Sequence, residues 1–220
     1  MLDITIIRHF LRWQHTYEPL TYQWIYASST FDALVSMATF RLNEDKAQQA
    51  TIVNSNKVSY KARNIYHPFL GEKAVRNNFD IQNHEYYIIT GANMAGKSTF
   101  LRTLGVNYIL AMNGLPVFSE EMCVSVFRLF TNMRTTDDLT HGISYFNAEL
   151  LRLKQLIASL DPNIPSLIIL DEILKGTNSL DKLNGSRLFL EYISKRNVTG
   201  VIATHDSELS KIEEENPQRF

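Results

Sequence analysis

One octapeptide limits what this chain can fold into more than any other feature of its 220 residues. Gly91 to Ser98 reads Gly-Ala-Asn-Met-Ala-Gly-Lys-Ser, which is a glycine, four free positions, a glycine, a lysine and a hydroxyl residue. The run Glu85 to Thr90 before it predicts a buried strand, and a helical pattern starts at Lys97. The glycines let the backbone curl, so that successive N–H groups and the helix start point at one phosphate. The sequence therefore predicts a phosphate-binding loop between a strand and a helix.

Two side chains at the end of this loop carry the chemistry that a bound triphosphate needs. The Lys97 ammonium can reach the β- and γ-phosphates, and the Ser98 hydroxyl can bind Mg²⁺. The pattern is specific, because average residue usage gives a chance match in a chain of this length with a probability on the order of 1%. We expect the phosphate-binding segment to comprise Gly91, Ala92, Asn93, Met94, Ala95, Gly96, Lys97, Ser98 and Thr99.

An acidic pair follows a second apolar run. Ser166 to Leu170 predicts a buried strand, and Asp171 and Glu172 come directly after it. Ligands collect at the carboxyl ends of strands in open α/β sheets, so Asp171 is placed to hold the metal and Glu172 to polarise an attacking water. By itself the pair also fits a plain exit from a strand. The phosphate-binding loop upstream favours the functional interpretation.

A histidine ends a third predicted strand. Thr199 to Ala203 is apolar and short, and Thr204 and His205 follow it. A histidine at this end of a strand can donate to a γ-phosphate or to the attacking water. A lone histidine is more often structural, but this one lies one strand beyond the acidic pair. We therefore expect His205 to sense the terminal phosphate, and we take Glu172, His205 and Lys97 as the catalytic candidates.

The order of the predicted elements gives the fold class. Strands alternate with helical patterns, which is typical of an α/β domain with a mixed, mainly parallel sheet flanked by helices. Further strands are predicted at Ile52 to Arg63 and Val75 to Ile81. The helices are predicted from Lys97 to Gly114, from Asn147 to Leu160 and from Lys182 to Lys195. On the second helix the apolar face is expected to consist of Leu150, Leu153, Ile157 and Leu160.

The first part of the chain predicts helix with an apolar seam. Its members recur at alternating steps of four and three and are Trp24, Ser28, Phe31, Val35, Ala38 and Leu42. Pro19 is expected to separate this helix from an earlier one at Ile4 to Tyr17. The seam either packs on the rest of the domain or belongs to a long lever helix that reaches into another part. We expect a helical segment at residues 1–48 and the α/β domain at residues 49–220.

Composition excludes some classes of protein. Lysine and arginine total 22 and aspartate and glutamate total 23, so a strongly basic nucleic-acid module standing alone is not favoured. Cys123 is the sole cysteine, which excludes an internal disulfide and fits a reducing compartment, so we expect a cytoplasmic protein. No apolar run reaches 18 residues and no signal peptide is evident, so no membrane contact is expected.

Four stretches together resemble the ATPase domain of MutS-type DNA mismatch-repair proteins. The loop has the family's Asn-Met after its first glycine, although Ala92 and Ala95 replace a common proline and glycine, and Lys175 replaces a usual arginine. Leu174 and Lys175 favour a divergent MutS-like branch. The four stretches are Thr90–Thr99, the signature segment at Thr135–Leu139 and Gly142–Glu149, the Walker B motif and D-loop at Leu170–Asp181, and the histidine motif at Ala203–Asp206.

The resemblance implies roles for single residues. The fold would be a P-loop NTPase of the ABC-ATPase type that binds ATP or ADP with Mg²⁺. Ser98 and Asp171 would hold the metal, and Ser144 would complete the site of a partner subunit in trans. Asn178 and Asp181 would lie at the same interface. Val75 and Arg76 would border the adenine.

The resemblance also implies partners and a function. The chain would form a homodimer through its ATPase face and contact DNA through domains that it lacks, so that ATP hydrolysis drives a conformational change of a DNA clamp. Because the chain ends soon after the histidine motif, we expect that a C-terminal dimerisation helix-turn-helix is missing. Hydrolysis by the isolated domain should be slow.

Alternative functions stay open. One is a nucleotide-gated MutS-like clamp or scaffold with little turnover or with a non-mismatch role. Another is a signalling or membrane-linked ATPase of the same fold. Other P-loop families fit less well, because the sequence contains neither the Leu-Ser-Gly-Gly-Gln string of ABC transporters nor the Asn/Thr-Lys-x-Asp string of GTPases.

Overall fold

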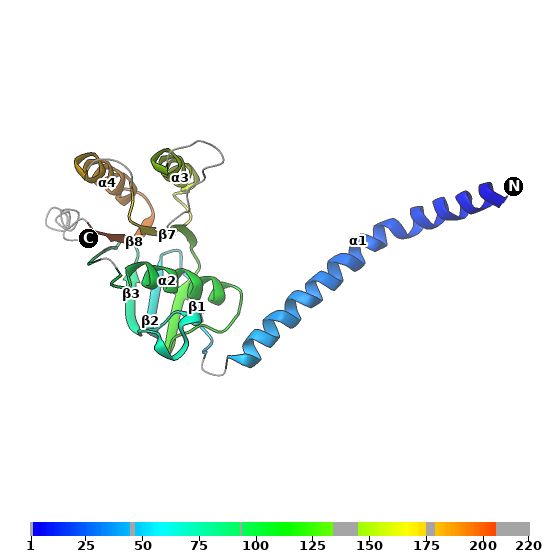
Figure 1. Ribbon diagram of the computed structural model, residues 1–220, viewed down its shortest axis with the longest axis horizontal. Coiled ribbons are helices and arrows are strands. Elements are labelled where there is room, and N and C mark those ends of the chain that lie inside the picture. Colours follow the sequence, from blue (N-terminus) through cyan, green and yellow to red (C-terminus); the bar gives the residue numbers. More distant parts are fainter. Residues whose placement is uncertain (1, 45–46, 93, 134–144, 175–178, 206–220) are drawn as a thin grey trace. The chain divides into compact units, whose positions relative to one another are not determined.

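The computed structural model divides the chain into two compact units, Met1–Asp45 and Lys46–Phe220. It describes residues 2–44, 47–92, 94–133, 145–174 and 179–205. Figure 1 shows the elements of both units in the colours of the sequence. Among the described residues, no helix combines the length and the hydropathy of a membrane span.

The described part of the first unit is one helix, α1 (Leu2–Asn43). The expected break at Pro19 is therefore wrong, since Pro19 lies inside α1. Proline lacks the N–H that would bond the carbonyl one turn earlier, but the turns on either side keep their helical bonds. The hydroxyls of Thr16 and Thr21 also donate to carbonyls four residues back. The helix continues because a proline removes one bond without forcing the chain to turn.

The apolar side chains of α1 follow a coiled-coil spacing over a longer stretch than the expected seam. This seam has Ala27 and Leu34 where Ser28 and Val35 were expected, and it does not include Leu42. They recur at steps of four and three from Ile6 to Ala38. Phe10 packs on Trp13, and Trp13 on Tyr17, with ring centroids 6.1 Å apart in each pair. Trp13 and Trp24 are exposed. The full seam is Ile6, Phe10, Trp13, Tyr17, Leu20, Trp24, Ala27, Phe31, Leu34 and Ala38.

The described strands of the second unit form two four-stranded sheets rather than the one mixed sheet that was expected. The first sheet is mixed, since β1 and β5 pair in parallel while β2 pairs antiparallel with both β3 and β5. Its order is β1 (Thr51–Val53), β5 (Glu121–Ser125), β2 (Ser59–Ile65), β3 (Asn77–Gln82). The second sheet is wholly parallel, in the order β4 (Tyr86–Thr90), β8 (Val198–Thr204), β7 (Ser166–Asp171), β6 (Arg128–Asn132).

Helices cover both faces of the parallel sheet, which confirms the α/β class. The helices described in this unit are the 3₁₀ helix η1 (Pro68–Lys73), α2 (Lys97–Met112), α3 (Tyr145–Ser159) and α4 (Ser179–Ser194). Along β7, Leu167 and Ile169 join one core cluster, and Ile168 and Leu170 join the other. The first cluster contains the buried face of α2, and the second contains those of α3 and α4. Since successive strand residues face opposite sides, β7 is buried on both.

The strand register brings three carboxyl ends to one edge of the parallel sheet. Thr90 of β4 pairs with Thr204 of β8, and Asp171 of β7 pairs with Ala203 of β8. The residues after these strands therefore emerge side by side. They are Gly91, Glu172 and His205, which the sequence separates by up to 114 positions.

Gly200 of β8 offers a test of this packing. It pairs with Tyr86 of β4, and a Cβ atom on Gly200 would lie 2.5 Å from Cδ1 of the Tyr86 ring. Tyr86 is 2% exposed, so its ring has little room to move. We expect Gly200→Ala to lower the free energy of unfolding by about 1–3 kcal/mol, measured by urea denaturation.

A matched control for this substitution lies in α2. A Cβ atom on Gly105 would lie 3.6 Å from Met133 Cε, which is an ordinary contact. Gly105→Ala should raise stability by about 0.5–1 kcal/mol, because alanine is the better helix former. Equal urea midpoints for Gly200→Ala and the wild type would show that β4 and β8 are not packed as described.

Candidate functional site

The loop between β4 and α2 has the backbone conformations that its glycines permit. Gly91 has a φ of 152°, and Gly96 has a φ of 93° at the N-cap of α2. Ala92 and Ala95 are not among the residues with positive φ, so the replacement of glycine by alanine at position 95 leaves the loop unstrained there. Met94 adopts a φ of 62° and is fully exposed. Asn93 lies outside the described residues.

The start of α2 has the character of an anion site. Gly96 contributes no side-chain cap, and the first turn carries Lys97, Ser98 and Thr99 rather than an acidic residue. The first N–H groups of a helix have no acceptor within the helix and carry a partial positive charge. Ser98 is half-buried in this turn. The backbone geometry and the partial positive charge of the helix start therefore suit an anion.

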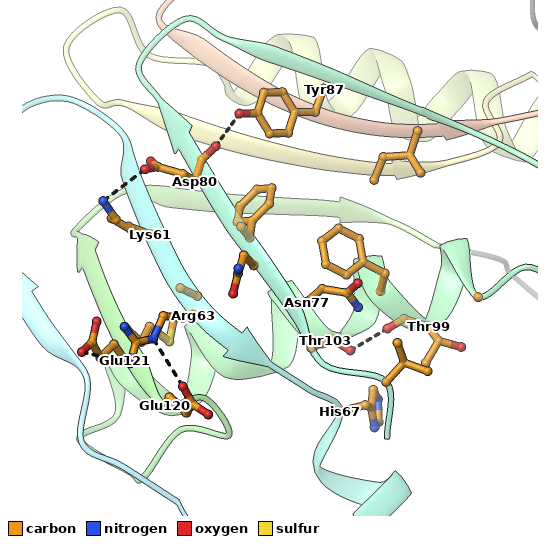
Figure 2. A pocket seen from close by; sticks show the side chains of 18 of the residues that line it. Lys61, Arg63, His67, Asn77, Asp80, Tyr87, Thr99, Thr103, Glu120 and Glu121 are labelled. Atoms are coloured by element: carbon orange, nitrogen blue, oxygen red, sulfur yellow. Dashed lines mark hydrogen bonds and ion pairs between the residues drawn. The ribbon is translucent and has the colours of Figure 1, made fainter. Parts of the chain in front are cut away.

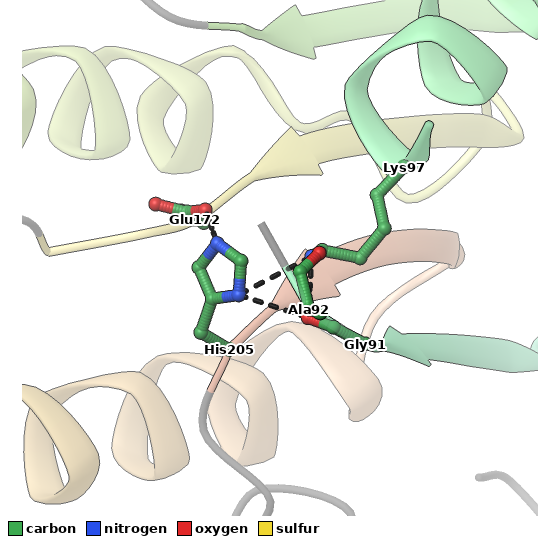
Figure 3. Close-up of polar contacts among 5 residues, drawn as sticks. All are labelled: Gly91, Ala92, Lys97, Glu172 and His205. Carbon is green, nitrogen blue, oxygen red and sulfur yellow. Dashed lines mark hydrogen bonds and ion pairs between the residues drawn. The ribbon is translucent and has the colours of Figure 1, made fainter. Parts of the chain in front are cut away.

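Lys97 connects this loop to the end of β8. Its side chain is buried, and Nζ donates to the carbonyls of Gly91 at 2.6 Å and Ala92 at 2.9 Å. The same ammonium lies 3.2 Å from Nδ1 of His205, which in turn lies 2.9 Å from the Gly91 carbonyl oxygen. Figure 3 shows the three groups together. The ammonium has three protons, and each has an acceptor within reach.

His205 also contacts the carboxylate of Glu172. Nε2 of the ring meets Oε1 of Glu172 (Figure 3), and the Glu172 side chain is 15% exposed whereas that of His205 is 31% exposed. Because a carboxylate only accepts, Nε2 carries the ring proton in this contact. In a neutral ring Nδ1 is then unprotonated and can accept from Lys97. Two catalytic candidates from β7 and β8 therefore join the loop lysine in one chain of polar contacts.

Asp171 has a different environment from its neighbour. It ends β7 and is 7% exposed, and its Oδ1 has no hydrogen-bond partner within the described part of the chain. A buried carboxylate oxygen without a donor suits a hard cation. The described residues contain no cluster of three or more His, Cys, Asp or Glu side chains. Mg²⁺ needs no such cluster, because it is usually held by one or two protein oxygens together with phosphate and water.

A cavity of about 1430 Å³ reaches the loop from the side of the mixed sheet. Ala95, Gly96, Lys97 and Thr99 line it together with side chains of β2, β3 and β5 (Figure 2). Lys97 thus faces both the cavity and the contacts with His205. Burial and the nearby Arg102 charge lower the pKa of His67, another lining residue. The cavity has room for the part of a ligand beyond its phosphates.

The remaining expected residues are distributed as follows. Val75 lines the cavity, whereas the Arg76 guanidinium lies 4.4 Å from the centroid of the Tyr66 ring. Asp181 is exposed in the first turn of α4. Ser144 and Asn178 lie outside the described residues. The described site therefore brings together the loop, Lys97, Glu172 and His205.

Glu149 of α3 is a buried residue that the sequence interpretation did not single out. It is 5% exposed, and its Oε1 accepts from the Leu174 N–H at 2.7 Å. Leu153 and Leu156, four and seven positions further on, are also buried. The buried face of α3 is therefore this stripe, whereas Leu150, assigned to it from the sequence, is exposed. The signal in the sequence that could have identified Glu149 is its position as a charged residue on the apolar stripe of α3.

Comparison with known proteins gives the same family as the resemblance of the loop, the acidic pair and the histidine motif. A family model described as MutS domain V matches residues 87–219. The chain therefore belongs to the MutS family. It is 33% identical over 166 residues to a protein named DNA mismatch repair protein MutS from Caldicellulosiruptor bescii, covering 70% of this chain and 19% of that protein.

Two further proteins of the same name show similar agreement. The one from Carboxydothermus hydrogenoformans is 31% identical, over 87% of this chain and 23% of its own length. The one from Syntrophomonas wolfei is 31% identical, over 91% of this chain and 24% of its own length. The chain thus spans about a fifth to a quarter of the length of these curated relatives.

Proposed function

We propose that this chain is the ATP-binding and ATP-hydrolysing domain of a MutS-like DNA mismatch-repair protein, with the architecture of an ABC-type P-loop NTPase. ATP binds at the loop from Gly91 to Thr99, and its γ-phosphate faces His205. The observation that carries the proposal is the meeting of Lys97, His205 and Glu172 at adjacent strand ends. Charged and polar groups from three chain segments converge there on a loop built for phosphate.

Each side chain has a role that its contacts support. Lys97 exchanges the carbonyls of Gly91 and Ala92 for phosphate oxygens, since all are acceptors for the same ammonium. Glu172 accepts a proton from the attacking water. His205 holds Glu172 through Nε2 and orients the water or the terminal phosphate. The protein contributes positioning and charge stabilisation rather than covalent chemistry.

Ser98 and Asp171 are the residues that would hold Mg²⁺. The unpartnered Oδ1 of Asp171 and the hydroxyl of Ser98 in the first turn of α2 fit such an ion. When bound, Mg²⁺ neutralises charge on the phosphate oxygens. Removal of the metal by EDTA is expected to abolish hydrolysis.

The complete active site is proposed to need a second subunit. Ser144 reaches the partner's ATP across a homodimer interface that includes Asn178 and Asp181. The mismatch-repair relatives are about four times as long as this chain. The proposal assigns DNA contact to segments like those of the relatives that this chain does not match. ATP binding then drives the movement of a DNA clamp.

This dimer arrangement predicts a concentration dependence. We expect the rate of ATP hydrolysis per chain to rise with protein concentration, because Ser144 acts only in trans. Phosphate release at saturating ATP over a range of chain concentrations measures it, with EDTA-treated protein as the background. A rate per chain that stays flat would contradict the shared site and leave a monomeric ATPase.

A second function is a nucleotide-gated clamp or scaffold with little turnover. One observation favours it: Lys97 and Glu172 both have partners within the chain, so each must change contacts before it can act on ATP. Equal phosphate release by the wild type and Glu172→Gln, with ATP binding intact in both, would select this function over hydrolysis.

A further inference from the structure

The loop after β7 has an unusual backbone. Glu172 has a φ of 54° and Leu174 a φ of 58°, and the buried Ile173 lies between them. Residues other than glycine rarely adopt positive φ, because Cβ approaches the backbone too closely. Such conformations persist only where the surrounding structure holds them from several sides. The direction of the Glu172 side chain therefore depends on what holds this loop.

Described contacts hold the loop on three sides. The Glu172 N–H donates to the Ala203 carbonyl of β8 at 2.8 Å. The Leu174 N–H donates to Glu149 Oε1 of α3 at 2.7 Å. The Leu174 side chain also lies against α4, where a Cβ atom on Gly185 would be 2.7 Å from Leu174 Cδ1. The backbone on both sides of Ile173 is thus fixed by hydrogen bonds to β8 and to α3.

The hydrogen bond from the Leu174 N–H to Glu149 of α3 is not explained by core packing, which would favour an apolar residue at position 149. Glu149 occupies the same stripe of α3 as Leu153 and Leu156, where an apolar residue would fill the space. A carboxylate is costly to bury unless it is hydrogen-bonded. In return, Glu149 supplies an acceptor to a buried N–H group that would otherwise lack one. The hydrogen bond to the loop is thus one reason for a carboxylate at position 149.

We propose that Glu149 is a positioning residue that fixes the loop after β7 so that the Glu172 carboxylate is held against His205. The role in turnover rests on the proposed ATP hydrolysis, whereas the role in placing Glu172 does not. Without the acceptor at Leu174, the loop relaxes from its positive φ angles and the carboxylate moves away from the ring. A displacement of about 1 Å at a catalytic group can cost on the order of 10²-fold in rate.

Three variants of the chain test this proposal. Glu149→Ala removes the acceptor, and Glu149→Gln keeps an Oε1 acceptor without the charge. Gln155→Ala, at an exposed position of the same helix, is the control for a truncated side chain. We expect Glu149→Ala to lower kcat on the order of 10²-fold with KM for ATP unchanged, since the loop that binds phosphate is not touched. Glu149→Gln should recover most of the rate.

A spectroscopic measurement reads the position of Glu172 without turnover. The ¹⁵N chemical shift of His205 Nε2, assigned through a His205→Gln variant, reports the contact with the Glu172 carboxylate. We expect Glu149→Ala to shift this signal in the same direction as Glu172→Gln does, and Glu149→Gln to leave it near the wild-type value. If circular dichroism shows that Glu149→Ala does not fold, Glu149→Asp replaces it, because the shorter side chain withdraws the carboxylate from Leu174. The kcat and the His205 Nε2 chemical shift are then measured for Glu149→Asp.

The outcomes separate the two proposals. An unchanged His205 signal in Glu149→Ala overturns the positioning role, whatever the rate, because Glu172 has then kept its place. Equal loss of rate in Glu149→Ala and Glu149→Gln also overturns it, because the acceptor would not be what matters. A wild-type chain that hydrolyses no more ATP than Glu172→Gln contradicts the proposed function, and the His205 signal then decides the positioning role alone.

Discussion

Replacement of Glu172 by glutamine is expected to lower kcat for ATP hydrolysis by about 10²- to 10⁴-fold, the range that a general base contributes. Glutamine has the size of glutamate and keeps an oxygen that can accept from His205 Nε2, so the loop after β7 should retain its contacts. It cannot take a proton from water. The dissociation constant for ATP should stay at the wild-type value. Phosphate release at saturating ATP and titration with a fluorescent ATP analogue measure the two quantities.

The matched control for this substitution is Glu191→Gln. Glu191 lies on the exposed surface of α4, where it pairs with Arg187 at 3.1 Å. Exposed pairs of this kind contribute little to stability, so neither turnover nor ATP binding should change. Unchanged turnover in Glu172→Gln would contradict the role of Glu172 in hydrolysis and would favour the clamp or scaffold with little turnover.

Lys97→Ala is expected to weaken ATP binding by about 10- to 150-fold, the equivalent of about 1.5–3 kcal/mol for hydrogen bonds to a charged group. Lys97 is buried beside the loop and supplies the only ammonium among the residues that Figure 3 draws. Its removal takes a cation from the site where the phosphates bind, so turnover at subsaturating ATP should fall at least as far. Titration with the fluorescent analogue in the presence of Mg²⁺ gives the dissociation constant.

Lys154→Ala serves as the control for the loss of a lysine. Lys154 is exposed on α3, and its removal changes net charge equally without touching the loop. Circular dichroism must show both variants folded, because Lys97→Ala also leaves the Gly91 and Ala92 carbonyls without their donor. ATP affinity that is equal in Lys97→Ala and Lys154→Ala would contradict a role of the Lys97 ammonium in phosphate binding.

The parallel sheet was largely predictable because its central strands are buried on both faces. Such strands appear in the sequence as short apolar runs, and β7 and β8 were found in this way. The strand β4, which lies at the edge of this sheet, was found from its β-branched and aromatic residues. The strand β6 was missed, since Arg128 and Thr131 interrupt its apolar pattern. The strand β5 was missed as well. The burial of an edge strand, or of a strand in a mixed sheet, depends on the elements packed around it. The local sequence pattern therefore predicts such strands only weakly.

Other features depend on contacts that no local pattern contains. The range Ile52 to Arg63 was predicted as one strand, but the structure has β1 and β2 there with a loop between them. The division into two sheets follows from strand pairing over long separations. From their positions in the chain, Glu172 and His205 were each predicted to follow the end of a strand. Only the pairing of β7 with β8 makes the two residues neighbours. The bond from Leu174 to Glu149 depends in the same way on the packing of α3.

The pairing of β4 with β8 also has a consequence for how the protein is made. The Gly91 carbonyl and the His205 ring meet across 114 positions of the chain. A ribosome adds about 5–20 residues per second, so the phosphate loop leaves the ribosome ~6–23 s before the strand that fixes it. Until then β4 lacks the strand with which it pairs in the described sheet. Assembly of the loop with the His205 ring therefore waits until β8 has left the ribosome and the slow, non-local closure of the sheet has taken place.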